Sequence, residues 1–286
     1  MVTDPKGRFA GKGTVYIKAR KGYDQTLIDK FESALGLTPE ASLADVGAGP
    51  GTLGIAFAEK GYKVSMIEPQ ESMRIEAEKA LKALQRDNTV GLSSVVINGD
   101  AIGTKLEPTS VDGVVAGTAI HWFPYQESLA EFNRILKPGG RIGAIYTGIL
   151  DKNSGKGKDL EEFLGNKSPE YQEYQRYFFW QNGMEAVSRL FIEEDKVAHQ
   201  EGVPKNRTFN KKEFLQWSLA RSFVPQEAKK KTELMVHLGK FFDEHNVDGN
   251  LTLTFNSGFD VGPLRKTEVM PNIPGPTAPW EEGVQR

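Results

Sequence analysis

The stretch Asp45-Val46-Gly47-Ala48-Gly49-Pro50-Gly51 decides the fold of this chain. It follows a short apolar run, Leu43-Ala44, and precedes a helix-like segment at residues 52–60. A strand, a glycine turn and a helix in this order present backbone N–H groups to a ligand. Glycine suits such a turn because the backbone must bend tightly and approach the ligand with no Cβ in the way. The stretch therefore predicts an enzyme with a nucleotide or nucleoside cofactor.

Two cofactor classes fit these glycines, and a purely structural turn is the third interpretation. Gly49-x-Gly51-x-x-Gly54 matches the dinucleotide pattern, which predicts NAD or FAD. Asp45-x-Gly47-x-Gly49-x-Gly51 matches the glycine loop of class I methyltransferases, which bind S-adenosylmethionine. Counted from Gly47 at the strand's end, a dinucleotide site would have glycine or alanine at position 52, but the residue is Thr52. Asp45 suits a ligand with an amino group and would repel a pyrophosphate. The loop thus favours S-adenosylmethionine.

Composition predicts a globular chain with room for one large domain or a domain with a sizeable insertion. The 286 residues are 38% hydrophobic and 26% charged. Because 36 Lys and Arg nearly balance 38 Asp and Glu, we expect no nucleic-acid partner. There is no cysteine and the four histidines show no metal-ligand spacing, so we expect no metal. Without a signal peptide or an apolar run of ~18 residues, we expect a cytoplasmic protein with no membrane contact.

Strand and helix patterns alternate along the first half of the chain. Strands are predicted at 42–46, 62–67, 93–97, 111–116 and 141–146, and helices at 24–35, 52–60, 71–84 and 124–136. Strands that alternate with helices and are apolar on both faces indicate helices on each side of a sheet. The expected fold class is therefore α/β, with a doubly wound, mostly parallel sheet.

The second half of the chain has a different character. A polar loop is expected at 151–158, helices at 159–165, 169–180, 184–198, 211–221 and 226–245, and a strand at 251–255. Four prolines from Pro271 onward predict a tail with little regular structure. We therefore divide the chain into an N-terminal helical segment covering the cofactor site (1–40), a Rossmann-like core (41–150), a helical lid or substrate region (151–245), and a C-terminal strand with a Pro-rich tail (246–286).

Motifs at the ends of five predicted strands together resemble the class I methyltransferases. Besides the glycine loop they are Glu68-Pro69-x-x-x-Met73, Gly99-Asp100-Ala101, the segment 111–123 and Leu136-Lys137-Pro138-Gly139-Gly140. Upstream, Tyr16-x-x-x-Arg20-x-x-Tyr23 is similar to another family segment, with Lys21 in place of its proline. The resemblance covers residues 9–147. The string Ala119-Ile120-His121-Trp122-Phe123 resembles the small-molecule branch that includes trans-aconitate methyltransferase-like proteins.

The resemblance implies a cofactor, S-adenosylmethionine, with S-adenosylhomocysteine as its product, and a role for each motif. Glu68 would accept hydrogen bonds from the ribose hydroxyls, Asp100 would contact the adenine amino group, and Asp45 the amino group of the methionine part. The alternatives are an exposed acid, a turn aspartate and a loop-stabilising aspartate, respectively. Met73 would cover the adenine or belong to the core. The expected cofactor residues are Tyr16, Arg20, Asp45, Gly47, Gly49, Gly51, Glu68, Pro69, Met73, Asp100, Ala101, Thr118 and Ala119.

His121 is the candidate catalytic residue because it follows the fourth predicted strand, where methyl donor and acceptor would meet. A neutral histidine can take a proton from a hydroxyl acceptor, and a protonated one can hold a carboxylate. A structural contact is the alternative. The aromatic residues crowded at 171–180 fit a packed helix or a lid over an apolar pocket.

The expected function is methyl transfer from S-adenosylmethionine to a small molecule, most simply at the oxygen of a carboxylate or hydroxyl. N- or C-methylation and a non-methylating enzyme of the same fold are alternatives, and an NAD-dependent oxidoreductase is less favoured. The sequence leaves the acceptor and the oligomeric state open.

Overall fold

The computed structural model describes residues 22–86, 93–151, 154–169, 171–172, 198–201, 204–221, 224–225 and 227–265. Several sequence predictions lie outside these residues: the sites at Tyr16 and Arg20, the tail from Pro271, and most of the helices expected at 169–180 and 184–198.

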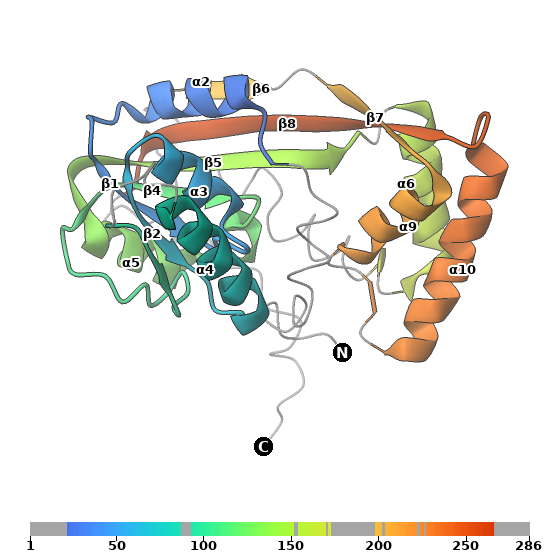
Figure 1. Cartoon of the computed structure of the whole chain (residues 1–286), viewed down its shortest axis with the longest axis horizontal. Coiled ribbons are helices and arrows are strands. Elements are labelled where there is room, and N and C mark those ends of the chain that lie inside the picture. Colours follow the sequence, from blue (N-terminus) through green and yellow to red (C-terminus); the bar gives the residue numbers. More distant parts are fainter. Residues whose placement is uncertain are drawn as a thin grey trace.

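An eight-stranded sheet runs through the molecule in the order β3-β2-β1-β4-β5-β8-β6, and β7 also pairs with β8 (Figure 1). The strands are β1 (Ser42–Val46), β2 (Lys63–Ile67), β3 (Val95–Ile97), β4 (Val111–Gly117), β5 (Leu136–Leu150), β6 (Ala198–Glu201), β7 (Lys205–Phe209) and β8 (Leu251–Pro263). The first five are parallel, whereas β8 runs antiparallel to β5, β6 and β7. The predicted mostly parallel sheet is confirmed.

Helices pack on both faces of this sheet. They are α2 (Gln25–Leu35), α3 (Thr52–Glu59), α4 (Glu71–Arg86), α5 (Tyr125–Ile135), α6 (Gly155–Lys167), α9 (Lys211–Leu219) and α10 (Ala228–His245). Leu43 and Ala44, neighbours on β1, are both fully buried but belong to different hydrophobic clusters. Successive strand residues point to opposite faces, so β1 is covered on each side. Leu43 shares its cluster with Phe57 of α3, and Ala44 with Phe132 of α5.

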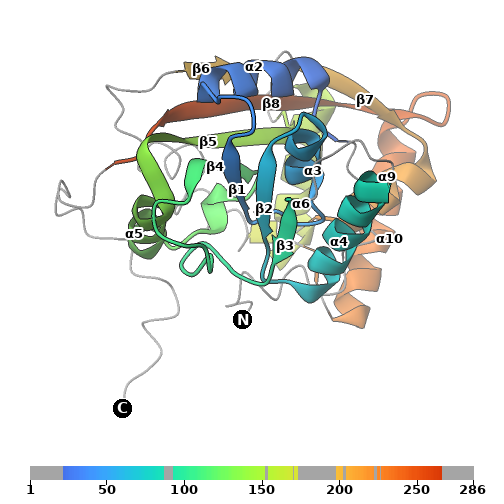
Figure 2. The same cartoon turned by 60° about the vertical axis from the view of Figure 1, so that its left-hand side comes forward.

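A third hydrophobic cluster lies at the far ends of β5 and β8. Figures 1 and 2 show α6, α9, α10 and β7 gathered there, away from the parallel strands. Leu150 of β5 and Leu253 of β8 are buried in this cluster together with Phe214 and Trp217 of α9 and Phe241 of α10. The helical half of the chain is therefore built on the extended ends of two strands of the central sheet.

The structure corrects several predicted boundaries. The strand expected at 141–146 is the middle of the 15-residue β5, which includes the turn expected at 136–140, and the strand expected at 251–255 continues to Pro263. Pairing between β5 and β8 extends both strands. Helix α6 begins at Gly155, inside the expected loop at 151–158. Its glycines weaken the helix signal, but burial of Leu160 and Leu164 compensates. Strand β7, with its polar sequence, was not predicted.

Helix α2 packs on the face of β5 and β8. Phe31 is fully buried, and its ring lies 5.3 Å from the ring of Phe259 on β8. A Cβ added to Gly143 of β5 would stand 2.6 Å from the Phe31 ring, so this approach requires glycine. The helix ends at Gly36, in the left-handed conformation expected of such a cap. The helical part of the predicted 1–40 segment thus covers the sheet face. Tyr23, just before α2, reaches the carboxyl end of β4 at Gly117.

Substituting Gly143 with alanine should loosen the contact between α2 and the sheet. The added methyl group meets Phe31 and Leu35, and such overpacking typically costs about 1–3 kcal/mol. Gly165→Ala in α6 is the matched control, because the added Cβ would meet no atom of the described residues within 4 Å. Replacing a glycine inside a helix with alanine should raise the stability by roughly 0.5–1 kcal/mol. Urea unfolding would measure both. Equal stability of the two variants would contradict the close contact.

Candidate active site

The carboxyl ends of β1, β2, β3 and β4 meet at one edge of the sheet because these strands are parallel. The predicted motifs follow directly: the glycine loop after β1, Glu68 after β2, Asp100 after β3, and Thr118 to His121 after β4. Open α/β sheets bind ligands at this edge. The structure therefore brings together motifs that lie up to 76 residues apart, from Asp45 to His121.

The glycine loop folds back against β2 and β4. Gly47, Gly49 and Gly51 have φ values of 68°, 58° and 84°, a region that side chains rarely adopt. The N–H groups of Gly47 and Ala48 both donate to the Ile67 carbonyl, at 2.9 and 3.1 Å. A Cβ on Gly47 would stand 2.7 Å from the Ala119 Cβ, whereas a Cβ on Gly49 would meet no atom of the described residues within 4 Å. Gly47 thus allows close packing, and Gly49 faces open space suited to a ligand.

Glu68 connects the end of β2 to the glycine loop. Its Oε2 accepts the Gly49 N–H at 2.9 Å, and its Oε1 accepts the Gln70 N–H at 2.8 Å. The residue is only 7% exposed, so the alternative of an exposed acid is wrong. Burial raises the pKa of Glu68, although the two N–H donors and Arg74 oppose the shift. Each carboxylate oxygen can accept a further hydrogen bond, as recognition of two ribose hydroxyls requires.

Arg74 supports this turn and was not identified from the sequence. Its Nη1 donates to the carbonyl oxygens of Glu68 at 3.1 Å and of Pro69 at 2.5 Å. Arg74 lies next to Met73, which is 3% exposed on α4. The signal that could have revealed Arg74 is its place in the first turns of the helix that follows the acid, where a long side chain can reach back.

Asp45 is fully buried at the carboxyl half of β1. Among the described residues, no group hydrogen-bonds to either of its carboxyl oxygens. Burial raises the pKa of Asp45 to about 7; the nearby Gly54 N–H opposes the shift, and the charge of Glu68 adds to it. Leaving a buried carboxylate without a partner is costly. A cationic group supplied by a ligand would relieve this cost.

Thr118, directly after β4, also has a buried polar atom without a hydrogen-bond partner among the described residues. Its backbone has a φ of 54°, an outlier for a β-branched residue, and its N–H donates to the Ile145 carbonyl at 2.8 Å. In the described part of the chain, nothing hydrogen-bonds to the buried Thr118 Oγ1. Strained residues of this type cluster at functional sites. Unsatisfied polar atoms on both sides of an open glycine loop fit the expected cofactor.

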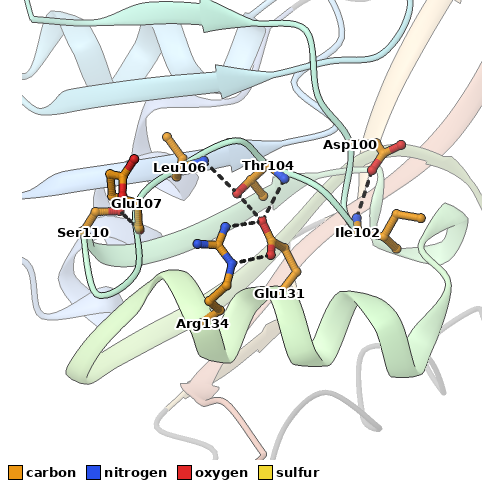
Figure 3. Close-up of polar contacts among 8 residues, drawn as sticks. All are labelled: Asp100, Ile102, Thr104, Leu106, Glu107, Ser110, Glu131 and Arg134. Carbon is orange, nitrogen blue, oxygen red and sulfur yellow. Dashed lines mark hydrogen bonds and ion pairs between the residues drawn. The ribbon is translucent and has the colours of Figure 1, made fainter.

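Asp100 forms the turn after β3 (Figure 3). Its Oδ1 accepts the Ile102 N–H at 3.0 Å, and its backbone pairs with Gly103. Asp100 therefore has the role of a turn aspartate. Its contact with the adenine amino group stays a prediction. Ala101 is buried with Ile67 of β2 in one hydrophobic cluster. This contact holds the Asp100 turn against the sheet.

A polar network ties the Asp100 loop to α5, and Figure 3 shows its three central side chains converging. Glu131 Oε1 accepts the N–H of Thr104 at 2.8 Å and its hydroxyl at 2.5 Å. Arg134 donates to both Glu131 oxygens at 2.7 Å. Burial opposes ionisation of Glu131, but these hydrogen bonds outweigh it and hold its pKa below the ordinary value. This network was not predicted from the sequence, in which the i,i+3 spacing of Glu131 and Arg134 is the available signal.

His121 lies on a short 3₁₀ helix, Ile120–Trp122, directly after β4. Its ring is 4.9 Å from the Trp122 ring. Phe123 is partly buried and packs against the core, with its ring 5.9 Å from the Phe132 ring and its ring edge towards Gly47. The segment from Ala119 to Phe123 therefore touches the glycine loop, which brings His121 to the edge of the candidate site.

The second half of the chain contributes one residue of the aromatic segment at 171–180 and a stacked arginine. Tyr171 is 3% exposed and belongs to the third hydrophobic cluster; Tyr174, Tyr177, Phe178, Phe179 and Trp180 lie outside the described residues. Arg221 stacks 5.0 Å from the Trp217 ring and donates to the Gly148 carbonyl at 3.5 Å. Among the described residues, no three His, Cys, Asp or Glu side chains are grouped to hold a metal ion, and no helix there is long and apolar enough to cross a membrane.

Comparison with known proteins agrees with this geometry. Residues 44–144 match a family model described as a methyltransferase domain. This segment is therefore similar to methyltransferase domains. Its glycine loop, its acid after β2 and its mostly parallel sheet agree with the resemblance to class I methyltransferases that the sequence predicts. The resemblance drawn from the sequence is confirmed at this level, while the trans-aconitate methyltransferase-like branch stays a prediction.

Relatives and solved structures support the same fold. An uncharacterized methyltransferase of Mycobacterium tuberculosis is 30% identical over 152 residues, 52% of this chain and 56% of that protein. One of Geobacillus kaustophilus is 26% identical over 148 residues, 49% of this chain and 65% of that protein. The chain thus spans between about half and two thirds of these curated relatives.

Among solved structures, a proposed type II methyltransferase from Anaeromyxobacter dehalogenans superposes with a TM-score of 0.57 at 17% identity, covering 85% of this chain and 97% of that one. A proposed methyltransferase from an antibiotic biosynthesis pathway of Anabaena variabilis gives 0.52 at 18% identity, with 83% and 97% covered. At these identities the likeness establishes the fold.

Replacing Glu131 with alanine should release the Asp100 loop from α5. Loss of hydrogen bonds to a charged, buried partner typically costs about 1.5–3 kcal/mol. Gln126→Ala, at an exposed position of the same helix, controls for changes in helix propensity. Chemical unfolding measures the stability, and hydrogen exchange at 100–106 measures the loop. Unchanged exchange in the Glu131 variant would show that other contacts hold the loop.

Proposed function

We propose that this chain is an S-adenosylmethionine-dependent methyltransferase with a small-molecule acceptor, and that the methyl group goes to the oxygen of a carboxylate or hydroxyl. The observation that carries the proposal is the buried Glu68 carboxylate, hydrogen-bonded to the open Gly49 loop at the edge where four parallel strands end. A buried acid with spare lone pairs beside an open glycine turn is suited to a ribose next to a cofactor backbone.

Each part of the cofactor has a chemically matched set of residues in this proposal. Glu68 accepts the ribose hydroxyls, and Met73 with Pro69, Asp100 and Ala101 surrounds the adenine. Asp45 serves the methionine amino group, and the N–H groups of the glycine loop serve its carboxylate. Thr118 and Ala119 flank the loop where β4 ends, and Tyr16 with Arg20 completes the predicted set. The two unsatisfied polar groups, Asp45 and Thr118 Oγ1, support this assignment.

S-adenosylmethionine supplies an already activated methyl group, so the protein's main tasks are alignment and exclusion of water. For a hydroxyl acceptor, His121 would take the hydroxyl proton at an imidazole nitrogen as the methyl group passes from sulfur to the acceptor oxygen, with S-adenosylhomocysteine as the leaving group. A carboxylate acceptor brings no proton, and His121 then positions it. Either way, the residue acts on the acceptor side of the site.

The helical region at 151–245 supplies the acceptor pocket in this proposal. Support comes from the direction of β5: it runs parallel to β4, so its carboxyl end leads from the site edge into the third hydrophobic cluster. The near balance of charges favours a small acceptor over nucleic acid, and cytoplasmic location stays a prediction. Binding of NADH but not S-adenosylhomocysteine would instead establish an oxidoreductase.

Glu68→Ala should weaken binding of S-adenosylhomocysteine at least ~10-fold, because two charge-assisted hydrogen bonds of roughly 1.5–3 kcal/mol each are lost. Since alanine also frees the Gly49 and Gln70 N–H groups, Glu68→Gln serves as a second variant of the same shape. Glu71→Gln, at an exposed position three residues on, is the control. Calorimetry measures the affinities. Unchanged affinity in both Glu68 variants would remove this residue from the site.

His121→Asn and His121→Ala should keep the affinity for S-adenosylhomocysteine within a few-fold while methyl transfer falls. The loss should be ~10²–10⁴ for a hydroxyl acceptor, the usual contribution of a proton-transfer group. It should be much smaller for a carboxylate acceptor. Single-turnover methylation and calorimetry separate the two effects. Full activity of both variants on a hydroxyl acceptor would exclude His121 as the base.

A further inference from the structure

Asp45 stands out among the buried groups of the site because no described residue compensates its charge. It is fully buried, and in the described part of the chain its oxygens receive no hydrogen bond. The elements around it contribute no cation: β2 places Met66 at the paired position, β4 places Val115, and α3 contributes the Gly54 backbone. The charged group that acts on it is another acid, Glu68.

A carboxyl group in such a place prefers to be neutral. Removal from water disfavours the charged form, and a neighbouring carboxylate disfavours it further. Glu68 differs because two backbone N–H groups stabilise its ionised form. Asp45 therefore keeps its proton up to a higher pH than an ordinary aspartic acid does. Burial raises the pKa of Asp45 to about 7.

We propose that the ammonium group of the cofactor's amino-acid part ionises Asp45 as it binds, so that cofactor binding is coupled to release of one proton. This inference rests on the proposed function, since it assigns the proton to the methionine end of that same site. The balance is simple: Asp45 goes from carboxyl to carboxylate, the proton passes to the buffer, and the ammonium of the ligand becomes the counter-ion.

The sign of the pH effect follows from this balance. Below a pKa near 7 the free protein carries the Asp45 proton and must lose it on binding, so affinity rises as the pH increases towards 7. With the bound form ionised throughout, about 0.9 proton should be released at pH 6 and about 0.1 at pH 8. The affinity should correspondingly be about tenfold weaker at pH 6 than at pH 8.

Calorimetry in two buffers of different ionisation enthalpy counts these protons on the unmodified protein. The probe is S-adenosylhomocysteine, and the matched control is methylthioadenosine, which keeps the adenine, ribose and sulfur but lacks the amino acid. Any proton released by Glu68 at the ribose appears with both compounds. A proton that belongs to Asp45 appears only with S-adenosylhomocysteine, and it disappears in Asp45→Asn, whose affinity should no longer depend on pH between 6 and 8.

Several results would overturn the proposal. Equal proton release with the two compounds, or release that persists in Asp45→Asn, would assign the proton to another group. Binding of S-adenosylhomocysteine with no release at pH 6 would refute the coupling and leave the proposed function intact. Absence of binding at either pH would refute both.

Unfolding of the ligand-free protein tests the Asp45 titration without any ligand. Because the pKa of Asp45 is raised in the folded state, the stability that neutral Asp45 contributes is complete below about pH 4 and is lost as the pH rises through 7. This fall should be reduced in Asp45→Asn. A parallel pH dependence of the two proteins would show that Asp45 is ionised in the folded state and would remove the basis of the coupling.

Discussion

The antiparallel pairing of β5 with β8 joins the two halves of this molecule. The part of β5 that pairs with β4 also pairs with the C-terminal part of β8, and there Phe259 of β8 packs against Phe31 of α2. At their outer ends Leu150 and Phe255 enter the aromatic core that α9 and α10 close. The same two strands thus support the cofactor edge and the helical region. A change in their pairing would alter the position of one half relative to the other.

Two acids at the edge of the sheet, Glu68 and Asp45, differ in their burial and in the hydrogen bonds that stabilise their charged forms. Glu68 accepts two backbone N–H groups, so its charge is supported before any ligand arrives. Asp45 is fully buried, and among the described residues no donor hydrogen-bonds to its carboxyl oxygens. The first acid therefore orders the glycine loop, while the second, in our proposal, responds to the cation of the ligand. Glu68 thus holds the glycine loop in place before a ligand binds, whereas Asp45 is the acid that we propose changes its ionisation on binding.

Local patterns predicted much of the fold and of the site. Short apolar runs located β1, β2 and β4, and the glycine spacing located the loop, because both signals are contained in a few consecutive residues. The acid at Glu68 was found for the same reason. The Glu131 network was not found, because it depends on Thr104, a residue that α5 meets only after the loop has folded. Strand β7 was missed because its polar residues pair with a partner far along the chain.

The sequence by itself determined the class of fold, the cofactor loop and the residues at the strand ends, since these depend on local conformation and on spacing. Only the tertiary structure decided the length of β5 and β8, the start of α6 and the burial of each acid. These features depend on long-range pairing and on which surfaces meet. Asp45 is the clearest case: its identity is plain in the sequence, but its charge depends on the low-dielectric surroundings that β2, β4 and α3 create together.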